Sequence, residues 1–383
     1  MSLLKEKHIL YSLITFLILL VVTLVVMGWS MGYRFNWREK SLNSTGMIAF
    51  NSLPVGAKVS LDGEVASVTN GSVSGIVPGK HHVQLIKDGY TPWEKDIEVF
   101  PQLVTEVNAL LIPISSRIEP LISGGARYPV LSPSRGRLVY FTQNGKYPGI
   151  WGLSLTGQPF LNIFKTSASP LIKDIPTVKF SNGEELIWSP QEDELLVKMN
   201  DSGYFLIDLR SSDYQATSSS EPTIARWEET LLKKRAAFVE NLKIPEYLIP
   251  MASDSDTLWS PNEQRFLYVK QDDDYIEYRV ANFEQPLAVG GQQEYVSLRL
   301  HKDTDLAVNW YSDSNHLILV SYDEVGQTGT IELIEIDGSN RSEVYSGNMS
   351  SSAVYSNPSG DRLIFLASFK NNTVPDLYTI SLR

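Results

Sequence analysis

The chain has 383 residues, 43% of them hydrophobic and 20% charged, which predicts more than one folded domain and excludes an intrinsically disordered chain. Its 33 basic and 44 acidic residues give a net charge of −11, which argues against a nucleic-acid partner because such partners require a cationic surface. The absence of cysteine excludes disulfides, cysteine-ligated metals and thiol nucleophiles, and the 25 Gly, 20 Pro and 18 Tyr favour a turn-rich β protein.

A continuous apolar segment lies near the N-terminus. Ile9–Met31 comprises 23 residues without a charged side chain, and a helix of that length spans the hydrocarbon core of a bilayer. We predict a transmembrane helix over residues 9–33, preceded by a short N-terminal tail, 1–8, and followed by a linker, 34–45. The alternatives are a buried helix of a soluble protein and a cleaved signal peptide, for which Gly28-Trp29-Ser30 offers a small-x-small site.

The orientation of this helix does not follow from counting basic residues. Lys and Arg flank the span on both sides, at Lys5, Lys7, Arg34, Arg38 and Lys40. Without residues 1–34, which hold three basic and one acidic residue, the chain has 30 basic and 43 acidic residues and a net charge of −13. A short tail before a large acidic β region is typical of a signal-anchor protein. We therefore expect a single-pass cell-membrane protein with extracytoplasmic C-terminal domains.

Short apolar runs alternate with turn signals between residues 46 and 113. The predicted strands are Met47–Phe50, Lys58–Leu61, His82–Ile86, Asp96–Val99 and Val104–Leu110. Between them, Asp62-Gly63 and Asn70-Gly71 supply the positive φ angles that tight hairpins require. These features predict a compact all-β domain over residues 46–113.

Several short motifs follow one another through this domain. In chain order they are Ser52-Leu53-Pro54-Val55-Gly56-Ala57, Val59–Gly63, Pro78–Val83, Lys87–Tyr90 and Trp93. In order and spacing they resemble the PEGA domain, a small β module of bacterial envelope proteins, although Val55 stands where the family has glutamate. The resemblance implies an extracytoplasmic, non-catalytic module that serves as a spacer or an adhesion unit. We expect Tyr90 and Trp93 to pack in its core instead of forming a ligand platform.

Residues 114–383 repeat one pattern five times: an apolar or aromatic residue, Ser-Pro or Ser-Asp, a polar turn and two strands. The repeated serines are Ser132, Ser189, Ser260, Ser312 and Ser356. The repeats resemble the WD40-like repeats of TolB-type β-propellers, whose hallmark turn is Trp-Ser-Pro-Asp-Gly, although Asp-Gly is replaced here. We expect an all-β chain ending in a propeller of about five blades, six being possible, with the repeated Trp packed between blades.

The order of the strands predicts how this propeller closes. A strand-like run, Arg117–Ile122, precedes the first repeat, and the fifth repeat ends on its third strand, Leu377–Leu382. The equivalents of Arg117–Ile122 after later repeats, such as Arg341–Tyr345, are outermost strands. We therefore predict that Arg117–Ile122 completes the last blade beside Leu377–Leu382, because this pairing removes an exposed sheet edge.

The largest insertion lies between the second and third repeats. After a polar loop, 211–220, Pro222 suits a first helical turn. Apolar residues then recur at helical spacing, at Ile224, Trp227, Leu231, Phe238 and Leu242, opposite a face charged by Glu228, Glu229, Lys233, Lys234 and Glu240. We predict a helical insertion over residues 221–244, which either packs on the propeller's side or mouth or projects as a partner-docking arm.

The sequence contains no His-Glu-x-x-His or Gly-x-Ser-x-Gly motif. Its histidines are His8, His81, His82, His301 and His316. The adjacent pair would point to opposite faces of a strand and does not readily chelate one metal. Gly75–Lys80 lacks the spacing of a phosphate loop, so we interpret it as a hairpin turn. Asp272–Asp274 lacks the spaced ligands of a calcium-binding loop, so we interpret it as a solvated turn. We therefore name no catalytic, cofactor-binding or metal-binding residue and expect no cofactor.

Taken together, these features predict a membrane-anchored extracytoplasmic binding or scaffold protein, not an enzyme. It would present its PEGA-like module and propeller to an envelope protein or a cell-wall glycan. One alternative is a carbohydrate-active enzyme with paired carboxylates in the propeller channel, and another is a spacer that binds nothing. A raised carboxylate pKa beside a second acid would favour the enzyme, and an exposed apolar patch at the mouth would favour binding over spacing.

Overall fold

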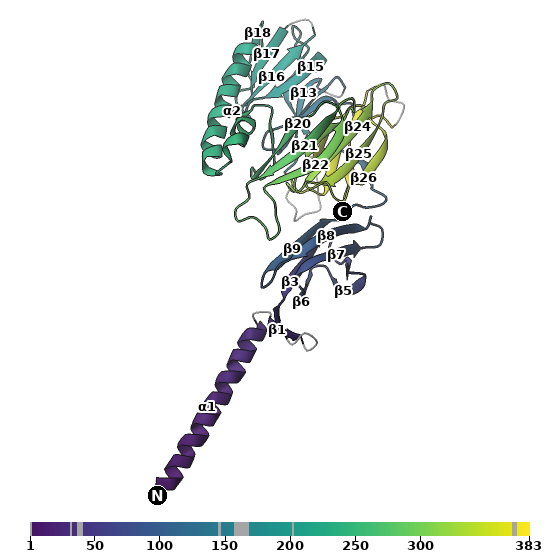
Figure 1. Cartoon of the computed structure of the whole chain (residues 1–383). Coiled ribbons are helices and arrows are strands. Elements are labelled where there is room, and N and C mark those ends of the chain that lie inside the picture. The colour runs from purple at the N-terminus through teal and green to yellow at the C-terminus, as the bar shows by residue number, and fades with distance from the viewer. Residues whose placement is uncertain are drawn as a thin grey trace. The chain divides into compact units, whose positions relative to one another are not determined.

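The chain divides into two units, Met1–Leu111 with Pro286–Gly291 and Ile112–Gln285 with Gln292–Arg383. The computed structural model describes residues 2–30, 33–36, 41–144, 147–156, 168–200, 203–369 and 374–383. Strands predominate in both units, and helices are few, as the composition with its 25 Gly, 20 Pro and 18 Tyr predicts (Figure 1).

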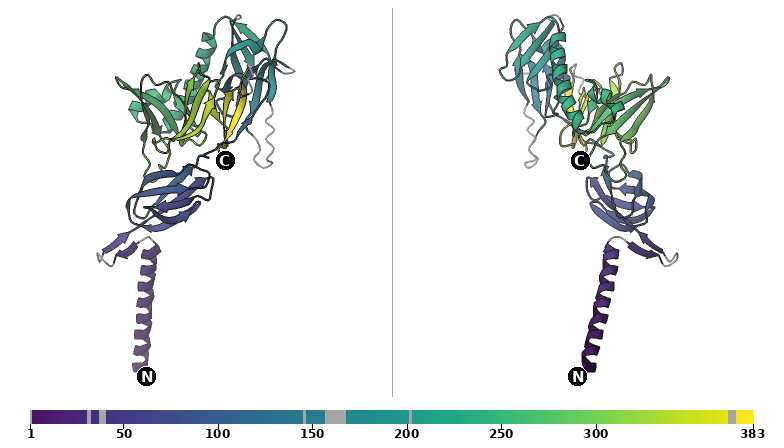
Figure 2. Two further views of the ribbon diagram at one scale, coloured as in Figure 1. Left: turned by 90° about the vertical axis from the view of Figure 1, so that its right-hand side faces the viewer. Right: turned by 60° about the vertical axis from the view of Figure 1, so that its left-hand side comes forward.

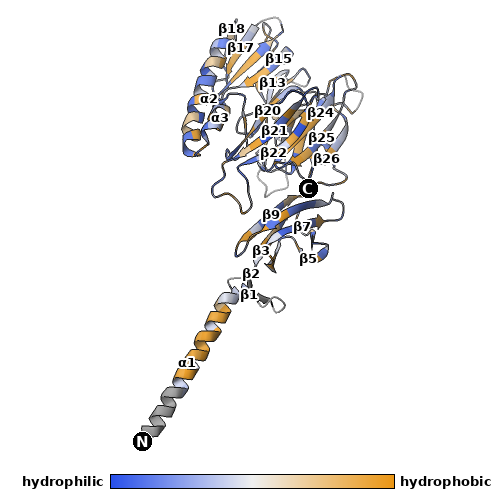
Figure 3. Ribbon diagram, viewed as in Figure 1, coloured by the Kyte–Doolittle hydropathy of each residue, from blue (hydrophilic) through white to orange (hydrophobic). Residues whose placement is uncertain are grey.

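The first unit begins with a long helix, α1 (Ser2–Ser30). Its segment Tyr11–Ser30 has a mean hydropathy of 2.6 and no buried residue, so it is long and apolar enough to cross a membrane, as a signal sequence also is. Figure 3 shows this apolar band. The helix is longer at its N-terminal end than the predicted span of 9–33, because it includes residues 2–8 of the expected tail. It ends at Ser30, and residues 31–32 lie outside the described residues.

The expected linker, 34–45, contains strands that the sequence did not indicate. β1 (Tyr33–Asn36) and β2 (Ser41–Ser44) pair antiparallel, with Tyr33 opposite Ser44. Residues 37–40 between them lie outside the described residues. Four-residue strands of mixed polarity are too short to show a two-residue hydrophobic period, which is why the pattern missed them.

The β domain of the first unit consists of two sheets, with strand orders β6-β3-β9 and β5-β4-β7-β8. Its strands are β3 (Gly46–Leu53), β4 (Lys58–Leu61), β5 (Glu64–Val68), β6 (Gly71–Ile76), β7 (Gly79–Ile86), β8 (Trp93–Val99) and β9 (Val104–Leu110). The five predicted strands are all present. β5 and β6 were missed because most of their side chains are exposed, so they carry no buried alternating face.

The core of this domain lies between the inner faces of the two sheets. Along β3 and β9, which pair in parallel, buried residues alternate with more exposed ones. The buried side chains include Ile48, Phe50, Val59, Val83, Leu85 and Val107. Trp93 is buried among them and Tyr90 packs against the cluster, which confirms that both belong to the core.

The turn predictions in this domain have different outcomes. Asn70-Gly71 does not form the predicted hairpin, because neither residue has a positive φ and the flanking strands β5 and β6 lie in different sheets. Asp62 and Gly63 both adopt positive φ, at 52° and 87°, and join β4 to β5 in the predicted tight hairpin. The reading of Gly75–Lys80 as a hairpin turn is wrong, because this segment connects β6 and β7, which lie in different sheets. Pattern alone does not distinguish a hairpin from a crossing between sheets, because both need turn residues.

The second unit contains five four-stranded antiparallel sheets, the predicted blades, which we number first to fifth in chain order. The first four sheets, with orders β11–β14, β15–β18, β19–β22 and β23–β26, use consecutive strands. Their bounds are β11 (Arg127–Leu131), β12 (Arg137–Thr142), β13 (Gly149–Ser154), β14 (Ala168–Lys173), β15 (Gly183–Trp188), β16 (Glu194–Met199), β17 (Gly203–Asp208), β18 (Tyr214–Thr217), β19 (Leu258–Trp259), β20 (Arg265–Gln271), β21 (Tyr275–Asn282), β22 (Glu294–His301), β23 (Ala307–Trp310), β24 (His316–Asp323), β25 (Thr328–Glu335) and β26 (Ser342–Asn348). A short 3-10 helix, η1 (Phe180–Asn182), precedes β15.

The fifth sheet joins the two ends of this unit. Its strands are β27 (Val354–Ser356), β28 (Arg362–Ala367), β29 (Asp376–Ser381) and β10 (Ile118–Pro120). β10 pairs antiparallel with β29, with Ile118 opposite Ile380, and the Leu121 N–H donates to the Leu377 carbonyl at 2.8 Å. The predicted pairing of the strand before the first repeat with the last strand is therefore confirmed. The fifth and first sheets also share one buried hydrophobic cluster.

Helices occupy the insertion between the second and third sheets, with bounds α2 (Glu221–Asn241), η2 (Glu246–Leu248) and α3 (Ile249–Ser253). Trp227 of α2 is buried and donates its indole N–H to Glu194 Oε2 of the second sheet at 2.9 Å. Val239 and Ala252 instead join the hydrophobic core of the third sheet. The insertion therefore packs between these two sheets and does not project as an arm (Figure 2).

Candidate functional site

The Ser-Pro-type turns of the five sheets share one backbone geometry. In each, the first residue donates its N–H to the carbonyl five residues later, and the fourth residue donates back to the first. The first residues are Ser132, Ser189, Ser260, Tyr311 and Asn357, and the fourth are Arg135, Glu192, Glu263, Ser314 and Gly360, with φ between 55° and 65°. The five repeats are thus one turn used five times.

The predicted alignment of the last two repeats is wrong by one residue. Tyr311 and Asn357, not Ser312 and Ser356, occupy the position of the repeated serine. Asn357 Oδ1 accepts the Arg362 N–H at 3.0 Å, as the serine hydroxyl does in the first three turns. In the fourth turn Tyr311 does not supply this acceptor, and Asp313 Oδ1 accepts the His316 N–H at 3.0 Å instead. The turn thus uses a side-chain acceptor that need not be serine, so matching serines misplaced the register.

Four of these turns place a side chain where the hallmark motif has glycine. A left-handed backbone costs a non-glycine residue about 1–2 kcal/mol because its Cβ approaches the following carbonyl oxygen. Three of the four side chains are charged, Arg135, Glu192 and Glu263, and all three line the same pocket. The replacement of glycine in these turns thus places three charged side chains in the lining of one pocket.

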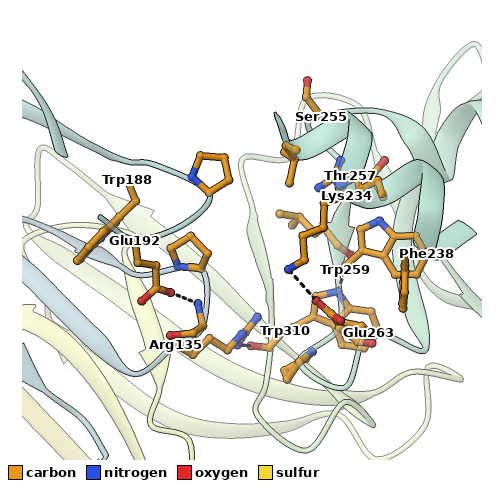
Figure 4. Close-up of a pocket in the computed structure, with 18 of the residues that line it drawn as sticks. Arg135, Trp188, Glu192, Lys234, Phe238, Ser255, Thr257, Trp259, Glu263 and Trp310 are labelled. Atoms are coloured by element: carbon orange, nitrogen blue, oxygen red, sulfur yellow. Dashed lines mark hydrogen bonds and ion pairs between the residues drawn. The ribbon is translucent and has the colours of Figure 1, made fainter. Parts of the chain in front are cut away.

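This pocket, which we call the mouth pocket, has a volume of about 970 Å³, at the upper end of the range for ligand sites (Figure 4). One wall comes from the first and second sheets and carries Arg135, Trp188 and Glu192. The opposite wall comes from α2 and the third sheet, with Lys234, Phe238, Trp259 and Glu263. Because α2 stands between the second and third sheets, the helical insertion forms part of the pocket.

Hydrogen bonds between sheets hold the turns of the mouth pocket in place. Arg135 of the first sheet donates from Nη1 to the carbonyl of Trp310 in the fourth sheet at 3.0 Å. The Ser134 N–H donates to Glu192 Oε1 of the second sheet. Side chains of the site thus fix the sheets to one another, and the pocket is formed before a ligand enters.

Three tryptophans that line the pocket hold its walls together. Each indole donates to a main-chain carbonyl: Trp188 to Val130 at 3.4 Å, Trp259 to Ala252 at 3.2 Å and Trp310 to Leu258 at 2.8 Å. For Trp188 and Trp310 the acceptor lies in the preceding sheet, which confirms the repeated Trp as an anchor between blades. Trp259 bonds α3 because the helical insertion precedes the third sheet.

Arg135 differs from the other cations of the mouth pocket. Lys234 lies 3.5 Å from Glu263, and Arg235 donates to two main-chain carbonyls and interacts electrostatically with the carboxylates of Asp254 and Asp256. Among the described residues, no carboxylate lies within 4.0 Å of the Arg135 guanidinium. Burial lowers the pKa of this guanidinium to about 10, so it is a cation at neutral pH. The pocket therefore contains a positive charge without a carboxylate partner.

The residues that the sequence singled out for chemistry line none of this pocket. His81 contacts Asp62 at 2.7 Å and His82 contacts Asp96 at 2.8 Å, so the adjacent histidines have different carboxylate partners. His316 and His301 contact Asp313 and Asp303, the side chain of His8 is outside the described residues, and Asp272–Asp274 form an exposed turn between β20 and β21. Across the described ranges, no group of three or more ligand-type side chains could hold a metal.

Sequence reasoning did not identify Arg135, Glu192 or Glu263 as site residues. Their signal was present, because each occupies the glycine position of a recognisable turn motif. A charged residue tolerated in a left-handed position is a reason to look for a role of its side chain. Which of the five turns meet α2, however, is decided by the fold.

Comparison with known proteins identifies the domain in the first unit. Residues 45–114 match the family model of the PEGA domain. No curated protein matches the chain. The chain therefore contains a PEGA domain, as its motifs predict.

Several solved structures resemble the chain at low identity. TolB from Acinetobacter baumannii is 13% identical, with a TM-score of 0.27, and the match covers 79% of this chain and 60% of TolB, so the chain spans less than two thirds of that protein. An oligogalacturonate lyase from Vibrio parahaemolyticus is 8% identical over 70% of this chain and 98% of that chain, with a TM-score of 0.26. A chain of a mitotic checkpoint complex is 8% identical, with a TM-score of 0.35, and the match covers 72% of this chain and 98% of that one. The fold described above therefore rests on the strand pairing, not on these similarities.

Proposed function

We propose that the chain is a membrane-anchored extracytoplasmic binding protein that holds a partner, an envelope protein or a cell-wall glycan, in the mouth pocket. The observation that carries this proposal is a pocket of about 970 Å³ whose walls are fixed by hydrogen bonds between different sheets. A preformed pocket loses little conformational entropy when a ligand enters, which favours recognition.

The N-terminal half of the proposal rests on α1 and the PEGA domain. We take α1 as a retained anchor because its apolar segment, Tyr11–Ser30, is 20 residues long, enough to cross the hydrocarbon core of a bilayer. The PEGA domain is a module of envelope and surface proteins, which supports an extracytoplasmic second unit. Protease added to intact cells or spheroplasts should digest the chain beyond α1, and protection by an intact membrane would overturn this location.

Binding is favoured over a spacer role by the apolar surface of the mouth pocket. Leu258 is 43% exposed there, and Phe238 and Trp259 are only half-buried. An enzymatic role is less well supported, because Glu192 accepts a main-chain N–H while Glu263 lies beside Lys234. Each carboxylate thus has its own partner, whereas glycosidases use two carboxyl groups that act together across one bond.

Photo-crosslinking tests the proposal. A benzoylphenylalanine at Gln191, which is exposed and lines the mouth pocket, should trap a discrete partner in cells. The same group at Glu324, an exposed residue of the β24–β25 turn that does not line the pocket, is the control. Equal labelling from both positions, or none from Gln191, would argue for a spacer. Turnover of a glycan that disappears in Glu192→Gln or Glu263→Gln would argue for an enzyme.

A further inference from the structure

We infer that the partner in the mouth pocket is an extended peptide that presents a carboxylate to Arg135. This inference rests on the proposed binding function and names the class of partner. Arg135 has five N–H donors, and among the described residues its side chain makes one hydrogen bond, from Nη1 to the Trp310 carbonyl. A guanidinium with free parallel N–H groups fits a carboxylate through two hydrogen bonds.

The charges around the pocket are complementary to an anion. Its lining includes three cations, Arg135, Lys234 and Arg235, against two carboxylates, Glu192 and Glu263. The chain as a whole carries a net charge of −11, so this excess of cations is local. Because Lys234 already has Glu263 beside it and Arg235 interacts with Asp254 and Asp256, Arg135 is the cation that gains most from an incoming carboxylate.

The rings of the walls favour a peptide over a glycan. The indole N–H groups of Trp188, Trp259 and Trp310 are all bonded to carbonyls of the chain, so these rings offer a sugar hydroxyl no free donor. Four prolines also line the pocket, at Pro133, Pro190, Pro261 and Pro358. Rings of Trp, Phe and Pro form grooves that receive proline and aliphatic side chains of extended peptides.

The left-handed backbone at Arg135 gives a second argument. Its φ is 62°, a conformation in which glycine is the unstrained choice. Gly360 occupies the equivalent position in the fifth turn, at 65°. The same turn therefore forms with glycine, and what Arg135 adds at this position is its guanidinium.

The experiment uses the full-length protein in detergent micelles. The probes are mixtures of N-acetylated tetrapeptides of Pro, Leu and Trp with a free C-terminal carboxylate, the same mixtures amidated, and amidated mixtures with one internal Asp. Trigalacturonate and inorganic phosphate supply the glycan and simple-anion arms. Bound species are identified by mass spectrometry, and their Kd is then measured by calorimetry.

We expect carboxylate-bearing peptides to be retained, and removal of the carboxylate to weaken binding by about 10- to 100-fold, the range for hydrogen bonds to charged groups. The free-carboxyl and Asp-amide arms distinguish a C-terminal carboxylate from a side-chain one. In Arg135→Gln and Arg135→Gly the carboxylate should no longer matter, whereas Arg299→Gln, which removes a cation of β22 outside the pocket, should bind like the parent. Arg135→Gly relaxes the backbone, so it also tests the inference if Arg135→Gln does not fold.

The outcomes separate the inference from the function on which it rests. Equal binding of amidated and free peptides would overturn the role of Arg135 while leaving a binding pocket. Preference for trigalacturonate or phosphate would replace the peptide by a glycan or a simple anion. Failure of every probe to bind the parent protein would count against both this inference and the proposed binding function.

Discussion

Glu263 occupies a left-handed backbone position with a φ of 55°, and this conformation determines how its substitution changes the free energy of unfolding. Replacing it with alanine keeps the unfavourable backbone, and replacing it with glycine relieves about 1–2 kcal/mol. Glycine loses about 0.5–1 kcal/mol through the greater freedom of the unfolded chain. Both variants lose the ion pair between Glu263 and Lys234. The side chains of both residues are more than half exposed, so this ion pair contributes only about 0–0.5 kcal/mol. Glu263→Gly should therefore be more stable than Glu263→Ala by about 0.5–1 kcal/mol.

Urea unfolding of the full-length protein in detergent, followed by tryptophan fluorescence, measures this difference as a shift of the transition midpoint. The matched control is Glu228, an exposed residue of α2, where glycine should be less stable than alanine by about 1 kcal/mol. The opposite signs at the two sites are the diagnostic result. If Glu263→Ala proves as stable as Glu263→Gly, the reasoning about the left-handed turn is refuted.

Three further results are expected. Burial lowers the pKa of His81, but hydrogen bonds to Asp62 and to the Val77 carbonyl outweigh this effect and raise the pKa above 6.5. Hydrogen bonds from the His81 ring and the His82 N–H lower the pKa of Asp62 below 3.8. The stabilisation from this pair is therefore complete between pH 3.8 and 6.5, and it declines as the pH rises through the folded pKa of His81 or falls through that of Asp62. Urea unfolding of the parent protein and of His81→Gln at a series of pH values will measure this stabilisation as the difference between the two. Trp310→Phe removes a fully buried indole donor and should lower the free energy of unfolding by about 2–3 kcal/mol, whereas an unchanged urea midpoint would contradict the anchor role. Leu121→Pro removes a hydrogen bond to β29 and should cost about 1–3 kcal/mol, with Leu121→Ala as the control that keeps the N–H.

Local pattern predicted most elements of both units. The alternation of apolar and polar residues in Val104–Leu110, and the helical spacing that begins at Ile224, reflect burial of one face, and that requirement is visible in sequence. Strands without a buried alternating face, such as Glu64–Val68, were missed for the same reason. The pairing of Arg117–Ile122 with the last strand was also predictable, because an unpaired edge is unfavourable in any β protein.

The candidate site was much less accessible to sequence reasoning. Arg135 and Phe238 are about a hundred residues apart in the chain, and nothing in the local pattern of either indicates the other. Serine matching also misplaced two repeats, because the turn needs a hydrogen-bond acceptor that Asn357 supplies in the fifth turn and Asp313 supplies in the fourth. Long-range proximity depends on how each sheet packs on the next, and that packing is degenerate in a repeating sequence.

The sequence by itself determined the apolar helix, the PEGA domain, five repeated blades and their closing strand, because each follows from hydrophobic periodicity and turn chemistry within short segments. The sequence left open whether the helical insertion packs on the sheets or projects as an arm, and only the tertiary structure decided that it packs on both the second and the third sheet. Only the tertiary structure also placed Arg135 across a pocket from this insertion, without a carboxylate partner among the described residues. The physical reason is that a pocket is formed by side chains distant in the chain, whose positions are fixed only once the sheets have packed.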